Sequence, residues 1–291
     1  ILPLMKIIKT GILFFVSAFT ALSINAQTNY LDNYLSGTVT YSIIAGASAQ
    51  VSSPRDLDFK PGRNELWVMN KGLLGGEVSN AGSETVIIFN AGLATQTTLF
   101  RKDSHASHFL QAGSAIAFSD IGEFGTTGEY HPGNTFMGPS LWSSDTAIYA
   151  RVFQNTYVSG SGRPRGSHLD MLHQSPYAMG IAHDNAKVYW VFDGYNGNIC
   201  KYDFVSDHGP GYDIHSAGKI WRHTGVTVTR VPNVPSHMVV DKNSGWLYFI
   251  DGGTKRLRRL NTNTGSVVGN LSAPNETLAG YYNMGSTATV E

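Results

Sequence analysis

A repeated pattern of short apolar runs constrains the fold of this 291-residue chain more than any other feature. Three segments open with a proline and continue with two apolar runs that are separated by a turn; they cover residues 54–90, 176–203 and 235–261. An aromatic residue follows each opening proline at the same interval, at Trp67, Tyr189 and Tyr248. Because a fixed period is the signature of repeat architectures, we expect each segment to be one structural unit.

Each unit has the pattern of a β-meander. The apolar runs are short and alternating, and the turns between them are rich in Gly, Asn and Asp, which tolerate positive φ. A polar residue ends the second run of every unit, at Asn70, Asp193 and Asp251. The sequence therefore predicts antiparallel strands joined by tight turns.

The spacing of the units predicts a fourth one. The interval from Pro54 to Pro176 is about twice the interval from Pro176 to Pro235, so a degenerate unit is expected between the first two. We place its opening run at residues 114–118 and its closing strand at residues 145–149. The Gly-rich stretch between them, residues 122–140, is interpreted as an insertion that is too long for a hairpin.

Repeated meanders without helical periodicity favour an all-β fold, namely a β-propeller of four-stranded blades. The pattern over residues 51–265 resembles the NHL-type and related six-bladed propellers, whose blades open with a proline near the central channel. The resemblance implies a six-bladed ring, of which this chain carries about four blade periods and is incomplete at its C-terminus. A genuine four-bladed ring is the alternative. Residues 37–44 alternate in polarity and are predicted to be the strand that closes the ring.

The N-terminal region has the three parts of a secretory signal peptide. Lys6 and Lys9 follow Met5, an apolar run covers residues 12–22, and small or polar residues lead to Gln27. The run is too short to span a bilayer, and no second run of about 18 apolar residues follows it. We therefore divide the chain into a signal peptide, 1–26, and a propeller, 27–291, and we expect a secreted protein without a membrane span, extracellular or periplasmic.

Composition excludes several other classes. Only 14% of the residues are charged, with 21 basic and 21 acidic, so the basic face that nucleic-acid binding requires is not expected. The single cysteine, Cys200, excludes a disulfide framework. It lies in an apolar strand without an evident base nearby, and we predict a buried, unreactive thiol.

Residues just after the blade prolines are expected to face the central channel. They supply a cation, a carboxylate, a phenol and an imidazole, at Arg55, Asp56, Tyr177 and His237. Converging polar groups in a concave site are typical of a binding pocket, here for a small molecule, a glycan or a peptide. The alternative is that Arg55 and Asp56 pair with neighbouring residues and His237 is a core histidine.

The blade around His237, residues 234–252, resembles a blade of the peptidyl-hydroxyglycine amidating lyases. That resemblance implies zinc held by channel histidines from three blades. The equivalent positions of the other units carry Asp56, Ala115 and Ala178 instead, so the histidine set is incomplete here.

A richer group of metal-ligating residue types flanks the third unit. Segments 168–173 and 207–215 contain six imidazoles and carboxylates, which are His168, Asp170, His173, His208, Asp213 and His215. We expect both segments to meet at one rim of the propeller. Mixed imidazole and carboxylate ligands suit Zn, Cu, Fe or Mn better than Ca, which prefers oxygen. The alternative is that these residues cap turns in loops between blades.

Three functions are compatible with this pattern. The first is a binding scaffold that recognises its ligand at the channel mouth, with or without a bound divalent metal. The second is a metal-dependent lyase or hydrolase, and the third is a structural cell-surface module. Fold analogy does not choose among them, because propellers host many unrelated activities.

Overall fold

The computed structural model describes residues 41–75, 81–133, 137–151, 157–158, 163–212 and 214–291. The chain separates into two compact units, residues 1–42 and 43–291. The predicted signal peptide, residues 1–26, lies outside the described residues. Within the described part of the second unit, strands dominate, and the helices are a 3-10 turn, η1 (Ala47–Ala49), and one turn of α-helix, α2 (Ala106–Phe109). No helix among the described residues is long and apolar enough to cross a membrane.

The first blade follows the predicted meander and adds a fourth strand. Its antiparallel sheet has the order β1 (Pro54–Phe59), β2 (Glu65–Leu73), β3 (Gly82–Phe89) and β4 (Thr97–Arg101). Side chains of β2 and β3 alternate between two buried clusters: Trp67, Met69 and Ile87 pack against the second blade, and Leu66, Val68, Val86 and Ile88 pack on the other face.

The second blade departs from the predicted boundaries. Its strands are β5 (Gly113–Phe118), β6 (Glu123–Gly128), β7 (Ser140–Ser143) and β10 (His168–Met171), and the short pair β8 (Tyr157–Val158) and β9 (Arg163–Pro164) lies between the last two in sequence. The predicted insertion at 122–140 is therefore wrong in part, because it contains β6. The predicted closing strand at 145–149 is also wrong, because these residues form a turn.

The third blade carries two additional strands at its outer edge. The order is β11 (Ala178–His183), β12 (Val188–Asp193), β13 (Asn198–Asp203) and β14 (Lys219–Thr227), followed by β19 (Gly280–Asn283) and β18 (Gly269–Asn270). β19 pairs with β14 in parallel, unlike the other strand pairs of this sheet. Cys200 of β13 is buried and not in a disulfide, and burial raises the pKa of its thiol to about 12, as expected for an unreactive cysteine.

The fourth blade consists of β15 (Met238–Asp241), β16 (Trp246–Asp251) and β17 (Arg256–Asn261). The outer edge of β17 pairs with residues 289–291, because the amide of Asn261 donates to the carbonyl of Thr289 at 2.9 Å and Leu260 bridges Val290. The predicted closing strand, 37–44, is wrong over residues 41–44, which form no strand; residues 37–40 lie outside the described part.

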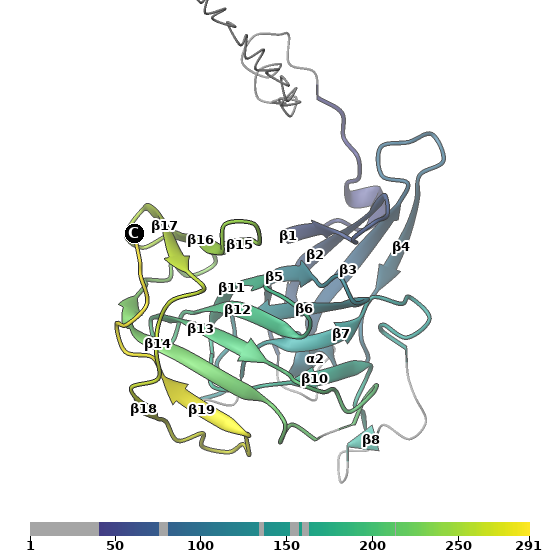
Figure 1. Ribbon diagram of the computed structural model, residues 1–291. Coiled ribbons are helices and arrows are strands. Elements are labelled where there is room, and N and C mark those ends of the chain that lie inside the picture. Colours follow the sequence, from purple (N-terminus) through teal and green to yellow (C-terminus); the bar gives the residue numbers. More distant parts are fainter. Residues whose placement is uncertain (1–40, 76–80, 134–136, 152–156, 159–162, 213) are drawn as a thin grey trace, which may run out of the picture. The chain divides into compact units, whose positions relative to one another are not determined.

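The small antiparallel sheets are arranged like a four-bladed propeller (Figure 1), which confirms the predicted all-β propeller class. The first strands of the blades, β1, β5, β11 and β15, contact one another in succession. Between the fourth blade and the first the contacts are polar: His237 lies 3.2 Å from Asp56, and Arg55 donates to the carbonyl of Asn233 at 2.6 Å. The innermost strands therefore surround one common space.

The polar residue that ends the second apolar run of each repeat accepts hydrogen bonds from neighbouring backbone segments. Asn70, Asp193 and Asp251 are fully buried. Asp193 accepts hydrogen bonds from the amides of Tyr195 and Asn196 at 3.0 and 2.9 Å. In the other repeats, Asn70 accepts the amide of Ser52, and Asp251 accepts the amide of Thr229.

Asp193 also forms an ion pair with Arg222, which is buried with it. The guanidinium donates to the carboxylate of Asp193 and the amide oxygen of Asn198 at 2.5 Å each. It also donates to the carbonyl of Gln174 and the hydroxyl of Tyr281. Removing one partner of such a buried ion pair destabilises the folded protein strongly, because the remaining charge stays buried without compensation.

Replacing Arg222 by methionine should destabilise the protein by about 3–5 kcal/mol, because Asp193 keeps a buried charge without its partner. Urea unfolding measures this loss. The matched control is Arg258→Met: Arg258 also pairs with a buried carboxylate, Asp251 at 3.2 Å, but 21% of its side chain is exposed, so water can reach the carboxylate that the substitution uncovers. We expect a clearly smaller loss for the control, and equal losses in the two variants would contradict this account.

Candidate functional site

Two members of the predicted channel-mouth set are engaged in a charged network. Arg55 lies 3.0 Å from the carboxylate of Glu129, and Arg230 lies 2.5 Å from the same carboxylate. Arg230 also stacks over Tyr177, with its guanidinium carbon 3.9 Å from the centre of the phenol ring. Glu129 and Arg230 thus link Arg55 to Tyr177, and both residues are engaged in contacts within the protein.

The other two members, Asp56 and His237, pair with each other at 3.2 Å. Asp56 also accepts the backbone amide of Ile116 at 2.8 Å, and Asp58 does the same for Phe118, so these carboxylates attach β1 to β5. The hydrogen bond that the His237 imidazole donates to the carboxylate of Asp56 raises the pKa of His237 above its ordinary value.

A cavity of about 400 Å3 lies among the four innermost strands. Its apolar lining comes from β1, β5, β11 and β15, and its polar lining includes Asp56, Asp58, His183, His237 and Lys242. Lys242 lies 3.0 Å from the Nδ1 atom of His183 and 3.7 Å from Asp120. The structure therefore brings Asp56 and His237 to the central cavity, whereas Arg55 and Tyr177 do not line it.

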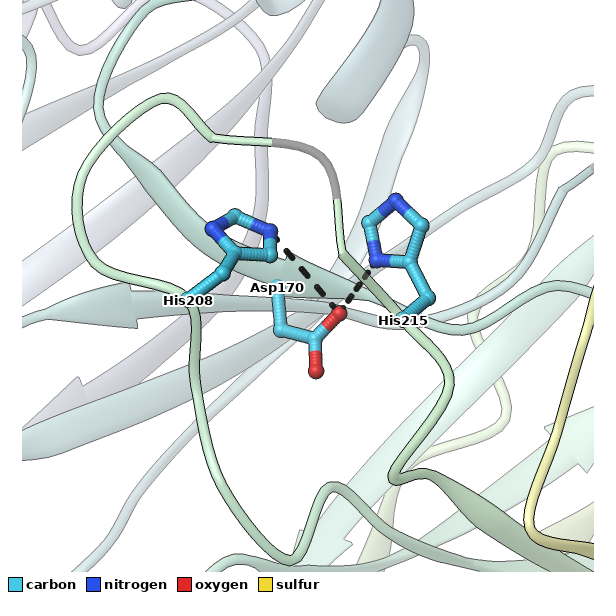
Figure 2. A group of neighbouring side chains, drawn as sticks. All are labelled: Asp170, His208 and His215. Atoms are coloured by element: carbon cyan, nitrogen blue, oxygen red, sulfur yellow. Dashed lines mark hydrogen bonds and ion pairs between the residues drawn. The ribbon is translucent and has the colours of Figure 1, made fainter.

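The predicted metal-ligating segments meet between the second and third blades. Segment 168–173 begins with β10, the outer strand of the second blade, and segment 207–215 lies between β13 and β14 of the third. Figure 2 shows that His208 and His215 approach the carboxylate of Asp170 from two sides. The Oδ1 atom of Asp170 lies 2.5 Å from His215 Nδ1 and 4.0 Å from His208 Nε2.

These three residues have the composition and spacing of a metal site. One donor atom from each of Asp170, His208 and His215 lies within 4.8 Å of the other two. The carboxylate and the His208 side chain are 1% and 2% exposed, whereas His215 is 14% exposed. The group could therefore hold a metal ion in a largely dehydrated environment.

His168 lies beside this group. Its imidazole is fully buried, stacks on Phe109 with ring centres 3.4 Å apart, and meets His208 edge to face at 5.1 Å. The Nδ1 atom lies 3.1 Å from the carbonyl of Arg165, whereas Nε2 has no hydrogen-bond partner among the described residues. Burial lowers the pKa of His168 well below its ordinary value, so the ring is neutral.

His173 lies near His215, with their ring centres 5.9 Å apart. Its Nδ1 atom is 3.2 Å from Glu276, which also accepts the backbone amide of His173 at 3.0 Å. A second cavity, of about 420 Å3, borders this region and is lined by His173, Ile214, His215, Ser216, Asn275, Glu276 and Thr277. Of the six predicted residues, Asp213 lies outside the described part of the chain.

Sequence reasoning missed several members of this region. Glu276 follows His173 by 103 residues, and nothing in its local sequence indicates the contact. His105 and His108 extend the group of aromatic rings through Phe109, whose ring centre is 4.5 Å from that of His108. The sequence signal for these two residues is their close spacing, three positions apart.

Comparisons with known proteins add little to this geometry. No family model matches the chain, and no curated protein matches it. Among solved structures, an auxiliary nutrient-binding protein from Bacteroides ovatus ATCC 8483 is similar at 12% identity and a TM-score of 0.42. The match covers 72% of this chain and 39% of that protein, so the chain spans well under half of its length. A similarity of this size does not assign a function.

The Asp56–His237 pair should make stability depend on pH. Because the folded-state pKa of His237 is raised, the pair stabilises fully below about pH 6.5, the ordinary imidazole pKa, and loses its effect as the pH rises through the raised value. Half of the His237 side chain is exposed, so solvent keeps the effect below about 1 kcal/mol.

Urea unfolding of His237→Gln and the parent protein at about pH 5.5 and about pH 8.5 measures this difference. We expect the variant to lose stability at the lower pH and almost none at the higher. In an Asp56→Asn background, His237→Gln should have the same small effect at both values. A pH-dependent effect that persists in that background would show that another group is responsible.

Proposed function

We propose that this chain is a secreted β-propeller that acts as a binding scaffold and holds a transition-metal ion at Asp170, His208 and His215. The observation that supports it is the convergence of three donor atoms, from two blades, within 4.8 Å in a buried setting. Secretion is supported by the basic, apolar and small-residue parts of segment 5–27.

Neighbouring atoms orient these donors for a metal ion. The Nδ1 atom of His208 lies 2.7 Å from the carbonyl of Gly209, which assigns the proton to Nδ1 and leaves the Nε2 lone pair toward Asp170. Asp170 Oδ1 accepts the amide of Met171 at 2.7 Å, which fixes the carboxylate on β10. At His215 an ion would replace the proton that now joins Nδ1 to the carboxylate.

The donor set selects among ions. Two imidazoles with one carboxylate suit Zn, Cu, Fe or Mn, whereas Ca would require mostly oxygen ligands. His168 and His173 flank the three donors and were predicted with them, and in this proposal they shape the surroundings of the ion. Asp213 is not assigned a role.

Elemental analysis of the purified, signal-free protein tests the proposal. We expect about one equivalent of Zn, Cu, Fe or Mn per chain after dialysis, and its loss in a His208→Ala/His215→Ala variant, because one remaining carboxylate does not retain such an ion. The matched control is His131→Ala, which removes a histidine remote from the site. The proposal fails if the parent protein takes up no stoichiometric ion or if the double variant retains it.

The central cavity favours a second function, the recognition of a small molecule, glycan or peptide. Its volume of about 400 Å3 falls within the range of ligand pockets, and its lining combines apolar strands with the Asp56–His237 and His183–Lys242 pairs.

Thermal-shift measurements with sugars, amino acids and short peptides test this second function. The exposed Val239 lines the cavity, so Val239→Trp should fill it and abolish any shift that the parent protein shows. Leu257→Trp, at an exposed position outside the lining, is the control and should keep the shift. A shift that survives Val239→Trp would place the ligand elsewhere.

A further inference from the structure

The metal group borders the 420 Å3 cavity on one side only. Of its three members, His215 lines this cavity, whereas Asp170 and His208 do not. His215 is also the most exposed of the three, at 14% against 1% and 2%. On the other side the group is closed by His168, which is fully buried against Phe109. An ion at this group is thus reached through the cavity beside His215.

The described residues supply three donor atoms to such an ion, and Asp213, which lies outside the described part, is not counted among them. Asp170, His208 and His215 provide the three donor atoms that lie close together, and the set does not include His168 or His173. An ion such as zinc prefers at least four ligands, and a site with three protein donors takes its fourth from outside the protein. Because His168 closes the group on one side, an external donor would reach the ion from the cavity side.

The cavity wall indicates which donor fits. Ser216, Asn275 and Thr277 are exposed, neutral and polar, and they offer hydroxyl and amide groups. Glu276 is the acidic residue of the lining, but its side chain is 1% exposed and accepts hydrogen bonds from the amide of His173 and the side chain of Gln174. The Glu276 carboxylate is thus engaged within the protein, and the exposed groups of the described wall are neutral and polar.

We propose that this cavity is a metal-dependent binding site for a small hydroxy-carboxylate. Its carboxylate supplies the missing ligand to the ion, and its hydroxyl groups meet the polar wall formed by Ser216, Asn275 and Thr277. The inference rests on the metal binding proposed above and adds the chemical class of molecule that the same site takes.

Cobalt-loaded protein tests the inference, because the visible d–d absorption of Co²⁺ responds to a change in its ligands. Cobalt uptake is measured first, and lactate is then titrated while the spectrum is recorded. We expect a saturable change with lactate and none with lactamide, which has the same shape without the charge. If the parent protein binds cobalt but its spectrum does not change with lactate, this inference is wrong and the proposed metal site stands.

Two variants locate the binding event. Thr277→Trp places a large ring in the cavity at an exposed position, so it should retain cobalt and weaken lactate binding by about tenfold or more. Ser272→Trp, exposed on the same segment but outside the lining, is the matched control and should bind lactate as the parent does.

The outcomes separate the two proposals. Absence of stoichiometric cobalt, with the protein folded by circular dichroism, means that the metal site itself is wrong. Bound cobalt with equal responses to lactate and lactamide, or equal affinities in the two tryptophan variants, means that the ion binds but the cavity is not its ligand site.

Discussion

The buried Arg222 guanidinium joins four segments of the described structure, through Asp193, Asn198, Gln174 and Tyr281. It joins the turn after β12 to β14 through Asp193, reaches the connection between β10 and β11 through Gln174, and contacts β19 through Tyr281. These contacts explain why a parallel strand can be added to the edge of the third blade. They also fix the backbone next to His173, and with it one wall of the cavity beside the proposed metal site.

The proposed metal site follows from the way blades adjoin. Asp170 belongs to the last strand of the second blade, and His208 and His215 belong to the connection between two strands of the third. The large apolar side chains between these blades, including Leu141, Leu169 and Leu172, form one cluster with residues of β11 to β14. A donor set assembled across such a packed boundary has little freedom to rearrange, which is the condition that metal ligands require.

The sequence was informative where a repeat imposed its period. The interval from the opening proline to Trp67 or Tyr189 located second strands whose aromatic side chains are fully buried. The same reasoning fails at β6, because the glycine-rich stretch 122–140 that contains this strand has the composition of a loop. In the structure a Cβ atom on Gly125 would lie 2.7 Å from Cδ1 of Ile181 and 2.9 Å from the ring of Tyr189, so glycine at this position lets the two blades pack closely.

For the site, the local density of histidine and aspartate singles out six residues, of which the structure brings the donor atoms of Asp170, His208 and His215 together. It could not find Glu276, because that residue reaches His173 across 103 positions through the path of β18 and β19. Nor could it show that Arg55 and Tyr177 are occupied by Glu129 and Arg230. Side-chain contacts between distant blades are set by packing, and a single sequence does not record them.

Strands of the first and fourth blades expose large apolar side chains, whereas the strands of the third blade bury theirs. Tyr189 and Phe192 of the third blade are fully buried, whereas Leu57 and Phe59 of β1 are 58% and 50% exposed, and Leu257 of β17 is 68% exposed. Each blade is stabilised mainly by its neighbours, and the first and fourth blades meet through polar contacts such as His237–Asp56, so each of them has one apolar neighbour and opens at a lower free energy than a blade with two. Amide protons of β12 and β13 should accordingly exchange with solvent last, and the molecule should lose its structure from its first and fourth blades inward.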